Sequence, residues 1–261
     1  MPMDLNGTSS IVTGGASGLG ESTARLLAAR GAKVVVLDMN EEKGNKVASD
    51  IGGAFVKADV TNTEEVTQAC ETALEMGPLR SLVTAAGIGM ATRTIGKDGS
   101  YDSAHNLDLF RRVLEINLVG TFNCVRLAAS AMSRTEPVDE DGSRGAIVTV
   151  SSVAGLEGQI GQVSYSASKG GVIGMVHPMA RDLAVVGIRV NCIAPGLIDT
   201  PIYGQGEGSE AFKENLRRDV LFPKRLGTAD EFATMALELI TNTYMNMQTI
   251  RVDGGIRFQP K

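Results

Sequence analysis

A glycine-rich turn at residues 13–20 makes a parallel α/β sheet the fold to expect. The apolar run before it, residues 9–12, predicts a short buried strand, and a helical pattern follows it as far as Arg30. Gly31 ends that helix, because the residue just past a helix end often adopts a positive φ. Residues 33–38 then predict a second buried strand. Strand, turn, helix and strand in this order form the βαβ unit of a parallel sheet.

The same alternation continues to the end of the chain and predicts an α/β protein with a single doubly wound parallel sheet. Further strands are expected at residues 54–58, 80–84, 146–150, 188–194 and 249–252, and further helices at 41–50, 63–76, 107–132, 165–186 and 228–241. Thr63 is expected to cap the helix at 63–76. About seven strands with helices on both faces fit one domain over residues 1–261, since 43% of the residues are hydrophobic.

Three segments depart from this alternation. Residues 88–106 are long for an α/β connection, and a segment of that kind is more often functional or mobile than ordinary. Residues 133–144 contain several charged side chains, a proline and a glycine, and we expect a solvated surface insertion there. Residues 201–222 begin with several glycines, and we expect them to form a substrate lid that is mobile before ligand binds.

The composition argues against several classes of protein. The 25 basic and 30 acidic residues give a net charge of -5, which does not favour binding to nucleic acid or to an anionic membrane. No apolar run of about 18 residues exists to span a membrane. The first twenty residues lack Lys and Arg, so we expect no secretory or mitochondrial targeting and a cytoplasmic location. The three cysteines, Cys70, Cys124 and Cys192, are expected to be reduced and to bind no metal.

The glycine turn and Asp38 together predict a dinucleotide site. Glycines let bare amides at a helix N-terminus approach a pyrophosphate, although a tight turn without a ligand is the simpler reading of the glycines alone. Asp38 ends the second predicted strand, eighteen residues after Gly20. A carboxylate there can bond both hydroxyls of an adenosine ribose and would repel a 2′-phosphate. Neither the turn nor Met39 and Asn40 supplies a cation for such a phosphate, so the expected cofactor is NAD.

Tyr165 and Lys169 are a candidate acid–base pair. They are four residues apart, so they lie on one face of a helix. A phenol has a pKa of roughly 10, and a fixed ammonium group nearby favours the phenolate and should pull that pKa toward neutrality. Such a pair could take a proton from a substrate hydroxyl or return one to a carbonyl. The spacing alone is weak, because a Tyr and a Lys on one helical face are usually packing and solvated surface.

With both motifs in view, the chain resembles the short-chain dehydrogenase/reductase family over essentially its whole length. The resemblance implies a Rossmann-like domain and a catalytic tetrad of Asn117, Ser152, Tyr165 and Lys169. Ser152 is preferred to Ser151 because the family usually places its serine thirteen residues before the tyrosine. By resemblance, Tyr165 exchanges the proton, Lys169 supports the phenolate and bonds the nicotinamide ribose, and Ser152 donates to the substrate oxygen. Asn117 would fix a water that links Lys169 to solvent.

The resemblance also implies a set of cofactor contacts. The family's glycine motif matches residues 13–20, and its PG motif matches Pro195 and Gly196. One motif departs, because the family's NNAG is Thr-Ala-Ala-Gly at residues 84–87, without the asparagines that usually brace the central sheet. The expected cofactor-binding residues are Gly14, Ser17, Gly18, Leu19, Gly20, Asp38, Asp59, Val60, Ala85, Gly87, Tyr165, Lys169, Pro195, Ile198 and Thr200.

Within the family, the chain is more similar to the branch of type-2 3-hydroxyacyl-CoA dehydrogenases, also called type-10 17β-hydroxysteroid dehydrogenases. Similar stretches are residues 155–162, 165–200, 222–227 and 250–260. This implies a homotetramer that uses NAD to oxidise a small molecule, a short 3-hydroxyacyl-CoA thioester or a hydroxysteroid. Ser152, Gln159, Gln162 and Tyr165 are the expected substrate contacts, although the two glutamines could equally face water. His105 and His177 suggest no role.

Three other functions remain open from the sequence. The enzyme could be a hydroxysteroid dehydrogenase, because steroid and acyl pockets are both largely apolar. It could be a 3-oxoacyl thioester reductase, although Asp38 counts against this because that reaction normally uses NADPH. From another class, it could be a scaffold subunit that keeps the fold without the chemistry. The complete tetrad and the acidic net charge both count against a scaffold.

Overall fold

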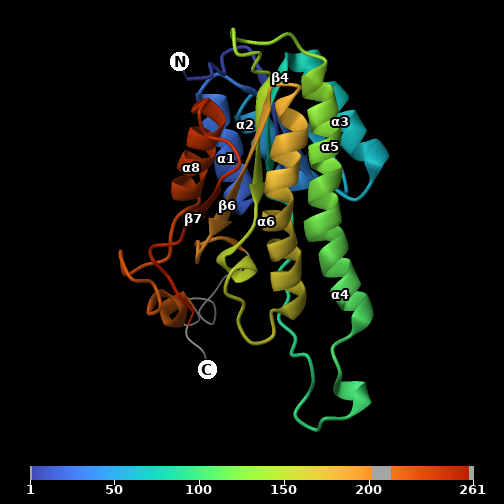
Figure 1. Cartoon of the computed structure of the whole chain (residues 1–261), viewed down its shortest axis with the longest axis vertical. Helices are drawn as coiled ribbons and strands as arrows, with labels where there is room; N and C mark the ends of the chain where they lie inside the picture. The colour runs from blue at the N-terminus through green and yellow to red at the C-terminus, as the bar shows by residue number, and fades with distance from the viewer. Residues whose placement is uncertain (1, 202–212, 259–261) are drawn as a thin grey trace.

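The computed structural model describes residues 2–201 and 213–258, and within them seven parallel strands form one sheet (Figure 1). The strand order is β3-β2-β1-β4-β5-β6-β7, so the predicted doubly wound α/β sheet is confirmed. The strands are β1 Ser9–Thr13, β2 Lys33–Asp38, β3 Ala54–Lys57, β4 Leu79–Thr84, β5 Gly145–Val150, β6 Ile188–Pro195 and β7 Thr249–Val252.

Helices cover both faces of the sheet. On one face lie α1 Gly18–Ala29, α2 Glu41–Asp50 and α8 Ala229–Thr241, and on the other lie α3 Thr63–Met76, α5 Gly120–Ser133 and α6 Val163–Ala184. The side chains of consecutive strand residues point to opposite faces of the sheet. In β2, Val34 and Val36 pack in one apolar cluster, and Val35 and Leu37 pack in the other. Because both faces are covered, these strands read in the sequence as continuous apolar runs.

The centre of the sheet fixes where a ligand can bind. From β1 the chain turns toward β2 on one side, and β4 lies on the other side of β1. Thr13 pairs in register with both Leu37 and Thr84, so the segments that follow β1 and β4 begin side by side. In open α/β sheets, ligands bind outside the carboxyl ends of the strands where the strand order reverses. The glycine turn and residues 85–87 therefore meet at the expected crevice.

Helix starts differ in detail from the sequence prediction. Asn62, not Thr63, caps α3, because its side-chain oxygen accepts hydrogen bonds from the backbone N–H groups of Glu64 and Glu65. The long helix expected at residues 107–132 is α4 Leu107–Leu114 and α5 joined by a π-helical turn, Glu115–Val119, which carries Asn117. Such turns are frequent at functional sites. α6 begins two residues earlier than expected, so Tyr165 lies in its first turn.

Two of the three irregular segments lie entirely within the described residues. The segment 88–106 projects beyond the sheet, next to the start of α4 (Figure 1), and contains the 3₁₀ turn Tyr101–Ser103. The surface insertion at 133–144 is tied to β4 by Arg80, whose guanidinium donates to Thr135 Oγ1 and to two backbone carbonyls. Half of the predicted lid, residues 202–212, lies outside the described residues. No helix in the described ranges is long and apolar enough to cross a membrane.

Arg189 is a buried cation that completes the end of α8. It lies on β6 with 8% of its surface exposed. Its guanidinium donates to the backbone oxygens of Leu239, Ile240 and Met245, at 2.9, 2.5 and 2.7 Å. The last carbonyls of a helix have no partner within the helix, so this side chain supplies the missing donors. One arginine thus joins the sheet to the helix that covers it.

Replacing Arg189 with Met should lower the free energy of unfolding by about 3 kcal/mol, because buried carbonyls then lose charged donors. Urea denaturation followed by circular dichroism measures this. The matched control is Arg111→Met, since Arg111 is an exposed residue of α4 that pairs with the exposed Asp108. Equal midpoints for the two variants would show that Arg189 does not stabilise α8.

Candidate active site

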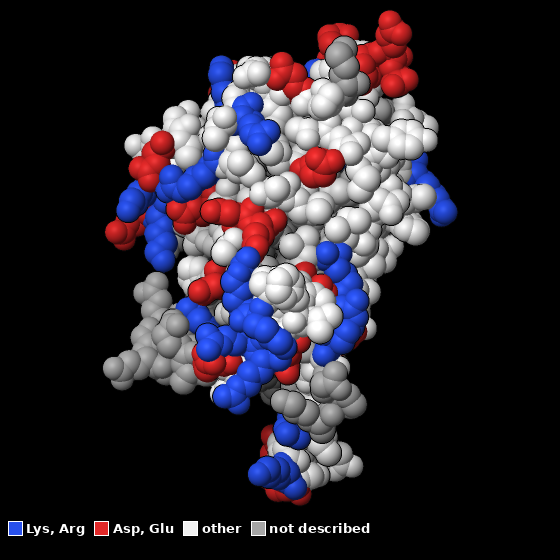
Figure 2. All heavy atoms as spheres, turned by 90° about the vertical axis from the view of Figure 1, so that its left-hand side faces the viewer, with Lys and Arg blue, Asp and Glu red and all other residues white. Residues whose placement is uncertain are grey.

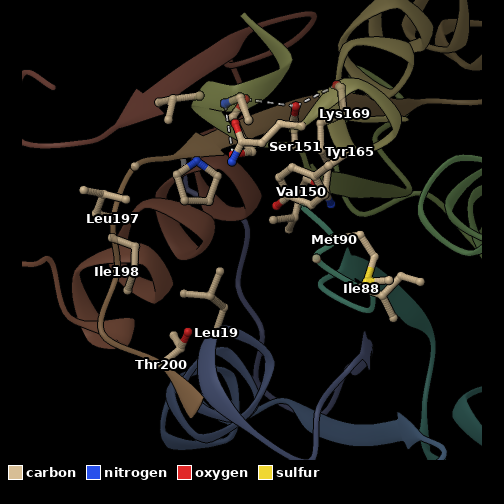
Figure 3. Close-up of a pocket in the computed structure, with 18 of the residues that line it drawn as sticks. Leu19, Ile88, Met90, Val150, Ser151, Tyr165, Lys169, Leu197, Ile198 and Thr200 are labelled. Carbon is tan, nitrogen blue, oxygen red and sulfur yellow. Dashed lines mark hydrogen bonds between the residues drawn. The ribbon is translucent and has the colours of Figure 1, made fainter. Parts of the chain in front are cut away.

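A cavity of about 400 Å³ opens at the carboxyl ends of the central strands. Figure 3 shows residues from distant parts of the chain around it, with Leu19 and Thr200 on one side and Ile88, Met90 and Tyr165 on the other. Many of the residues predicted from the sequence line this cavity: Leu19, Ala85, Gly87, Ser152, Gln162, Tyr165, Lys169, Pro195, Ile198 and Thr200.

Tyr165 and Lys169 lie together in the cavity, as their spacing on α6 predicts. The Lys169 ammonium nitrogen is 5.8 Å from the centre of the Tyr165 ring. Burial nevertheless raises the pKa of the Tyr165 phenol, and a hydrogen bond with the Ser152 side chain acts weakly in the other direction. The expectation that Lys169 draws this pKa toward neutrality is therefore wrong for the chain by itself. The cost of burying a phenolate is the largest cause of this shift.

Lys169 itself is almost completely enclosed, with 5% of its surface exposed. Its ammonium group donates to the carbonyl of Val150 at the end of β5, at 2.9 Å. Burial lowers the pKa of Lys169 from 10.5 to about 8. Gly87 lies directly beside this group, since a Cβ added there would be 3.6 Å from the Lys169 nitrogen. The buried amine can therefore give up or take up a proton near neutral pH.

The lowered pKa of Lys169 predicts a specific dependence of stability on pH. Between about 8 and 10.5 the unfolded chain binds more protons at this residue than the folded chain. The free energy of unfolding should therefore rise with pH across that interval, and below it the folded state bears the cost of a buried charge. In Lys169→Met this contribution is lost.

Urea denaturation at about pH 7 and about pH 9.5, without added cofactor, compares wild type with Lys169→Met. The wild type should gain stability relative to the variant at the higher pH. Lys97→Met is the control, because Lys97 is exposed in the 88–106 segment. Parallel pH profiles for wild type and Lys169→Met would contradict a depressed pKa.

Asn117 is completely buried and joins three segments around the cavity. Its side-chain oxygen accepts from the Ile88 N–H at 2.8 Å, and its amide donates to the Ile88 carbonyl at 2.9 Å and to Ser168 Oγ at 3.1 Å. Ser168 Oγ in turn donates to the Tyr165 carbonyl at 2.7 Å. Both amide donors of Asn117 are thus used within the protein. The predicted water-binding role of this residue stays a prediction.

The end of β4 is held without the asparagines that the family motif supplies there. The Ala86 N–H donates to Thr13 Oγ1 at 3.1 Å, and the Ala85 N–H donates to the Thr13 carbonyl at 3.2 Å. Asn117 then holds Ile88 from the other side. The Thr-Ala-Ala-Gly sequence therefore leaves this strand end fixed to β1 and to the π-helical turn.

The two neighbouring serines after β5 have different surroundings. Ser151 Oγ donates to the Lys169 carbonyl at 2.7 Å, a bond drawn in Figure 3, which ties its hydroxyl to α6. Ser152 Oγ accepts from the Ala154 N–H at 3.1 Å and caps the 3₁₀ turn Val153–Gly155. Ser152 is also the serine whose side chain meets the Tyr165 phenol. The structure thus places Ser152 with Tyr165 and Lys169, as the sequence predicts.

The glycine turn is compressed where β1 passes into α1. Gly14 and Gly18 have φ values of 64° and 53°. A Cβ on Gly20 would lie 2.1 Å from the Gly14 carbonyl oxygen, so no other residue fits there without a shift of backbone. Asp38 supports the turn, because its carboxylate accepts from the Ala16 N–H at 3.1 Å and from the Asn40 N–H at 2.9 Å. The turn and Asp38 form one unit beside Leu19.

Nine predicted residues are not among those that line the cavity: Gly14, Ser17, Gly18, Gly20, Asp38, Asp59, Val60, Asn117 and Gln159. Asp59 follows β3, and its carboxylate accepts from the backbone and side chain of Thr61. The Val60 carbonyl is engaged by the side chain of Asn123 at 2.8 Å. Gln159 lies along a neighbouring groove, and only Gln162 of the two glutamines reaches the cavity. The interpretation of Gln159 as a substrate contact is therefore not supported by its position.

Several apolar residues line the cavity without having been predicted. They come from the start of the 88–106 segment, from the strand ends and from the C-terminal segment: Ile88, Met90, Ala91, Val150, Leu197 and Phe258. For the residues from the 88–106 segment, the one signal in the sequence was the unusual length of that segment. Nothing in the sequence pattern marked Phe258, since its approach depends on the path of the chain after β7.

Among the described residues, no group of three or more His, Cys, Asp or Glu side chains could hold a metal ion.

Comparisons with known proteins agree with this geometry. The family model for short chain dehydrogenases matches residues 9–209. The chain is 44% identical to 3-hydroxyacyl-CoA dehydrogenase type-2 of Drosophila melanogaster, over 96% of this chain and 98% of the relative. The human protein of the same name is 44% identical over 98% of this chain and 97% of its own length. The crystal structure of 3-hydroxyacyl-CoA dehydrogenase type-2 from Mycobacterium avium superposes with a TM-score of 0.91, at 46% identity, covering 98% of each chain.

Proposed function

Because the chain belongs to the short-chain dehydrogenase family, and is thus an oxidoreductase acting on CH–OH groups, we propose that it oxidises 3-hydroxyacyl-CoA thioesters with NAD. The observation that carries the proposal is the meeting of Ser152, Tyr165 and Lys169 in one largely apolar cavity beside the glycine turn. The two curated relatives reported above, each 44% identical over nearly the whole chain, bear the name of this activity.

The residues around the turn fit a dinucleotide. The turn is so tight that a Cβ at Gly20 would collide with the Gly14 carbonyl, and α1 begins there without a side-chain cap, which leaves its first amides free for a phosphate. Asp38 would bond the adenosine ribose, and the cavity residues Gly87, Lys169 and Thr200 would hold the nicotinamide half. When bound, NAD accepts the hydride and its positively charged ring favours the Tyr165 phenolate. Asp59 and Val60 stay proposed contacts for the adenine.

The catalytic roles follow from the side chains. Tyr165 takes the proton of the substrate's secondary alcohol, and Ser152 donates a hydrogen bond to the same oxygen as charge develops on it. Lys169 provides a buried amine beside Tyr165, and the positive charge of its ammonium form favours the Tyr165 phenolate. Asn117 keeps Ile88 and α6 in place around these groups.

The apolar lining supports an acyl chain as the part of the substrate that enters. Ile88, Met90 and Leu197 face the cavity from different sides (Figure 3), and Phe258 adds an aromatic wall. Burial of apolar surface would hold the chain, while the few polar groups orient the reacting carbon.

A homotetramer and a cytoplasmic location stay proposals. Exposed apolar side chains of the π-helical turn and of α5, Val119 and Phe122, support an assembly through this part of the chain.

The test is turnover of 3-hydroxybutanoyl-CoA with NAD and then with NADP, followed by the absorbance of the reduced cofactor. Turnover with NAD and little with NADP supports the proposal. Binding of NAD without turnover of any thioester would contradict it and would direct the search to hydroxysteroids. If no secondary alcohol were oxidised although NAD bound, a scaffold role would be the better explanation.

A further inference from the structure

A small apolar cluster ties together the segments that surround the cavity, apart from the two large cores of the sheet. Its buried members are Val153 after β5, Leu197 after β6, Val220 in the described part of the predicted lid and Ile256 after β7. Phe258 packs against it and also lines the cavity. The C-terminal segment therefore takes part in the site, although it lies far from the catalytic residues in sequence.

Charged side chains fasten this C-terminal segment to the loop after β5. The Glu157 carboxylate pairs with the Arg251 guanidinium, and its second oxygen accepts from the Phe258 N–H at 3.2 Å. Arg251 also bonds Asp253 at 2.6 Å and the Ile256 carbonyl at 2.8 Å. On the face of the molecule that carries α8 and this segment, basic side chains gather with acidic ones between them (Figure 2). We call the Glu157, Arg251 and Asp253 set the tail clasp.

The position of the tail clasp connects it to the chemistry. Glu157 lies five residues after Ser152, in the loop that begins with the 3₁₀ turn that Ser152 caps. Arg251 lies on β7. The clasp thus spans from the loop of the catalytic serine to the segment that carries Phe258. Its side chains are partly exposed, 27% for Glu157 and 22% for Arg251, so the pair should add little to global stability.

We propose that Phe258 sets the size of the substrate that the cavity accepts, and that Glu157 and Arg251 are positioning residues that hold it there. This inference rests on the proposed function. Phe258 touches the cavity, whereas Glu157 acts through the backbone of Phe258 and through Arg251. Arg251 is the main cause of a lowered pKa of the Glu157 carboxyl, which keeps the clasp charged at neutral pH.

The first experiment compares wild type with Phe258→Ala on 3-hydroxybutanoyl-CoA and 3-hydroxyoctanoyl-CoA. Removing the ring enlarges the cavity, so the ratio of kcat/KM for the longer over the shorter thioester should rise about 10-fold. The KM for NAD should not change. Tyr244→Ala is the control, because Tyr244 is a fully exposed aromatic residue away from the cavity. An unchanged ratio in Phe258→Ala would overturn the role in substrate size.

The second experiment removes the charge of the clasp with Glu157→Gln. The KM for the shorter thioester should rise severalfold with little change in kcat, and amide hydrogen exchange at residues 253–258 should accelerate. Glu71→Gln is the matched control, since it breaks a surface ion pair with Arg134 elsewhere on the molecule. Unchanged exchange and an unchanged KM in Glu157→Gln would overturn the positioning role.

The two proposals fail in different ways. If wild type oxidised no thioester but did oxidise another secondary alcohol, the proposed function would fall. The ratio would then be measured with small and bulky alcohols of that class, and an unchanged ratio in Phe258→Ala would overturn the inference. If thioesters are oxidised and only the chain-length ratio is unaffected, the proposed function stands and the role of Phe258 falls.

Discussion

Replacement of Tyr165 with Phe is expected to lower kcat/KM for the thioester about 1,000-fold, because the proton of the alcohol then has no positioned acceptor. The change removes a single oxygen and keeps the ring, so the packing of α6 against the cavity should persist. In the chain alone, burial raises the pKa of this phenol, so its function as a base depends on the charges placed beside it. Steady-state kinetics with saturating NAD measures the loss.

The same variant should still bind NAD with near wild-type affinity, which fluorescence titration with NADH would report. Tyr101→Phe serves as the control, because Tyr101 is fully exposed in the 88–106 segment. Residual activity within a few fold of wild type would show that another group takes the proton. Loss of both turnover and cofactor binding would indicate that the substitution had disturbed the site more widely.

Asp38→Asn should change the preference between NAD and NADP about 100-fold in favour of NADP, since charges near a protein surface interact by roughly 1 to 4 kcal/mol over about 4 Å. The amide keeps one acceptor, so only one of the two backbone donors from Ala16 and Asn40 loses its partner. Binding of NAD should also weaken, because the ribose hydroxyls lose a charged acceptor. The measurement is the ratio of kcat/KM for the two cofactors.

Asp50→Asn is a suitable control for the loss of one carboxylate, because Asp50 ends α2 and forms an exposed pair with Arg25. An unchanged cofactor ratio in Asp38→Asn would mean that other residues reject the 2′-phosphate. A lowered melting temperature with an unchanged ratio would limit Asp38 to its structural role in the glycine turn.

The sheet could be predicted from sequence because its chemistry is local and repetitive. Strands covered on both faces, such as β2, appear as unbroken apolar runs, and Gly31 and Asp38 mark where the helix and strand end. The error at the start of α3 came from two adjacent residues that can both cap a helix. The side chain of Asn62 makes the capping bonds, so the observed cap lies one position before the predicted one.

The site was predictable only in part. The spacing of Tyr165 and Lys169 was enough to place both on one helix face, but spacing does not encode burial. The carbonyl of Val150 and the surrounding strands enclose Lys169, and that enclosure decides the direction of both pKa shifts. Gln159 and Phe258 show the same limit, since their positions depend on where a loop and a chain end pass in three dimensions.

The bonding of Asn117 to Ile88 has a consequence for how such an enzyme can diversify. Its amide engages both the N–H and the carbonyl of Ile88, as a neighbouring strand would, at the point where the 88–106 segment leaves the body of the protein. The positions of Gly87 and Lys169 therefore do not depend on the residues that follow Ile88. Insertions, deletions and new side chains can accumulate in the projecting part while the reacting groups keep their places. In this fold the substrate range can therefore change during evolution while the catalytic chemistry is kept.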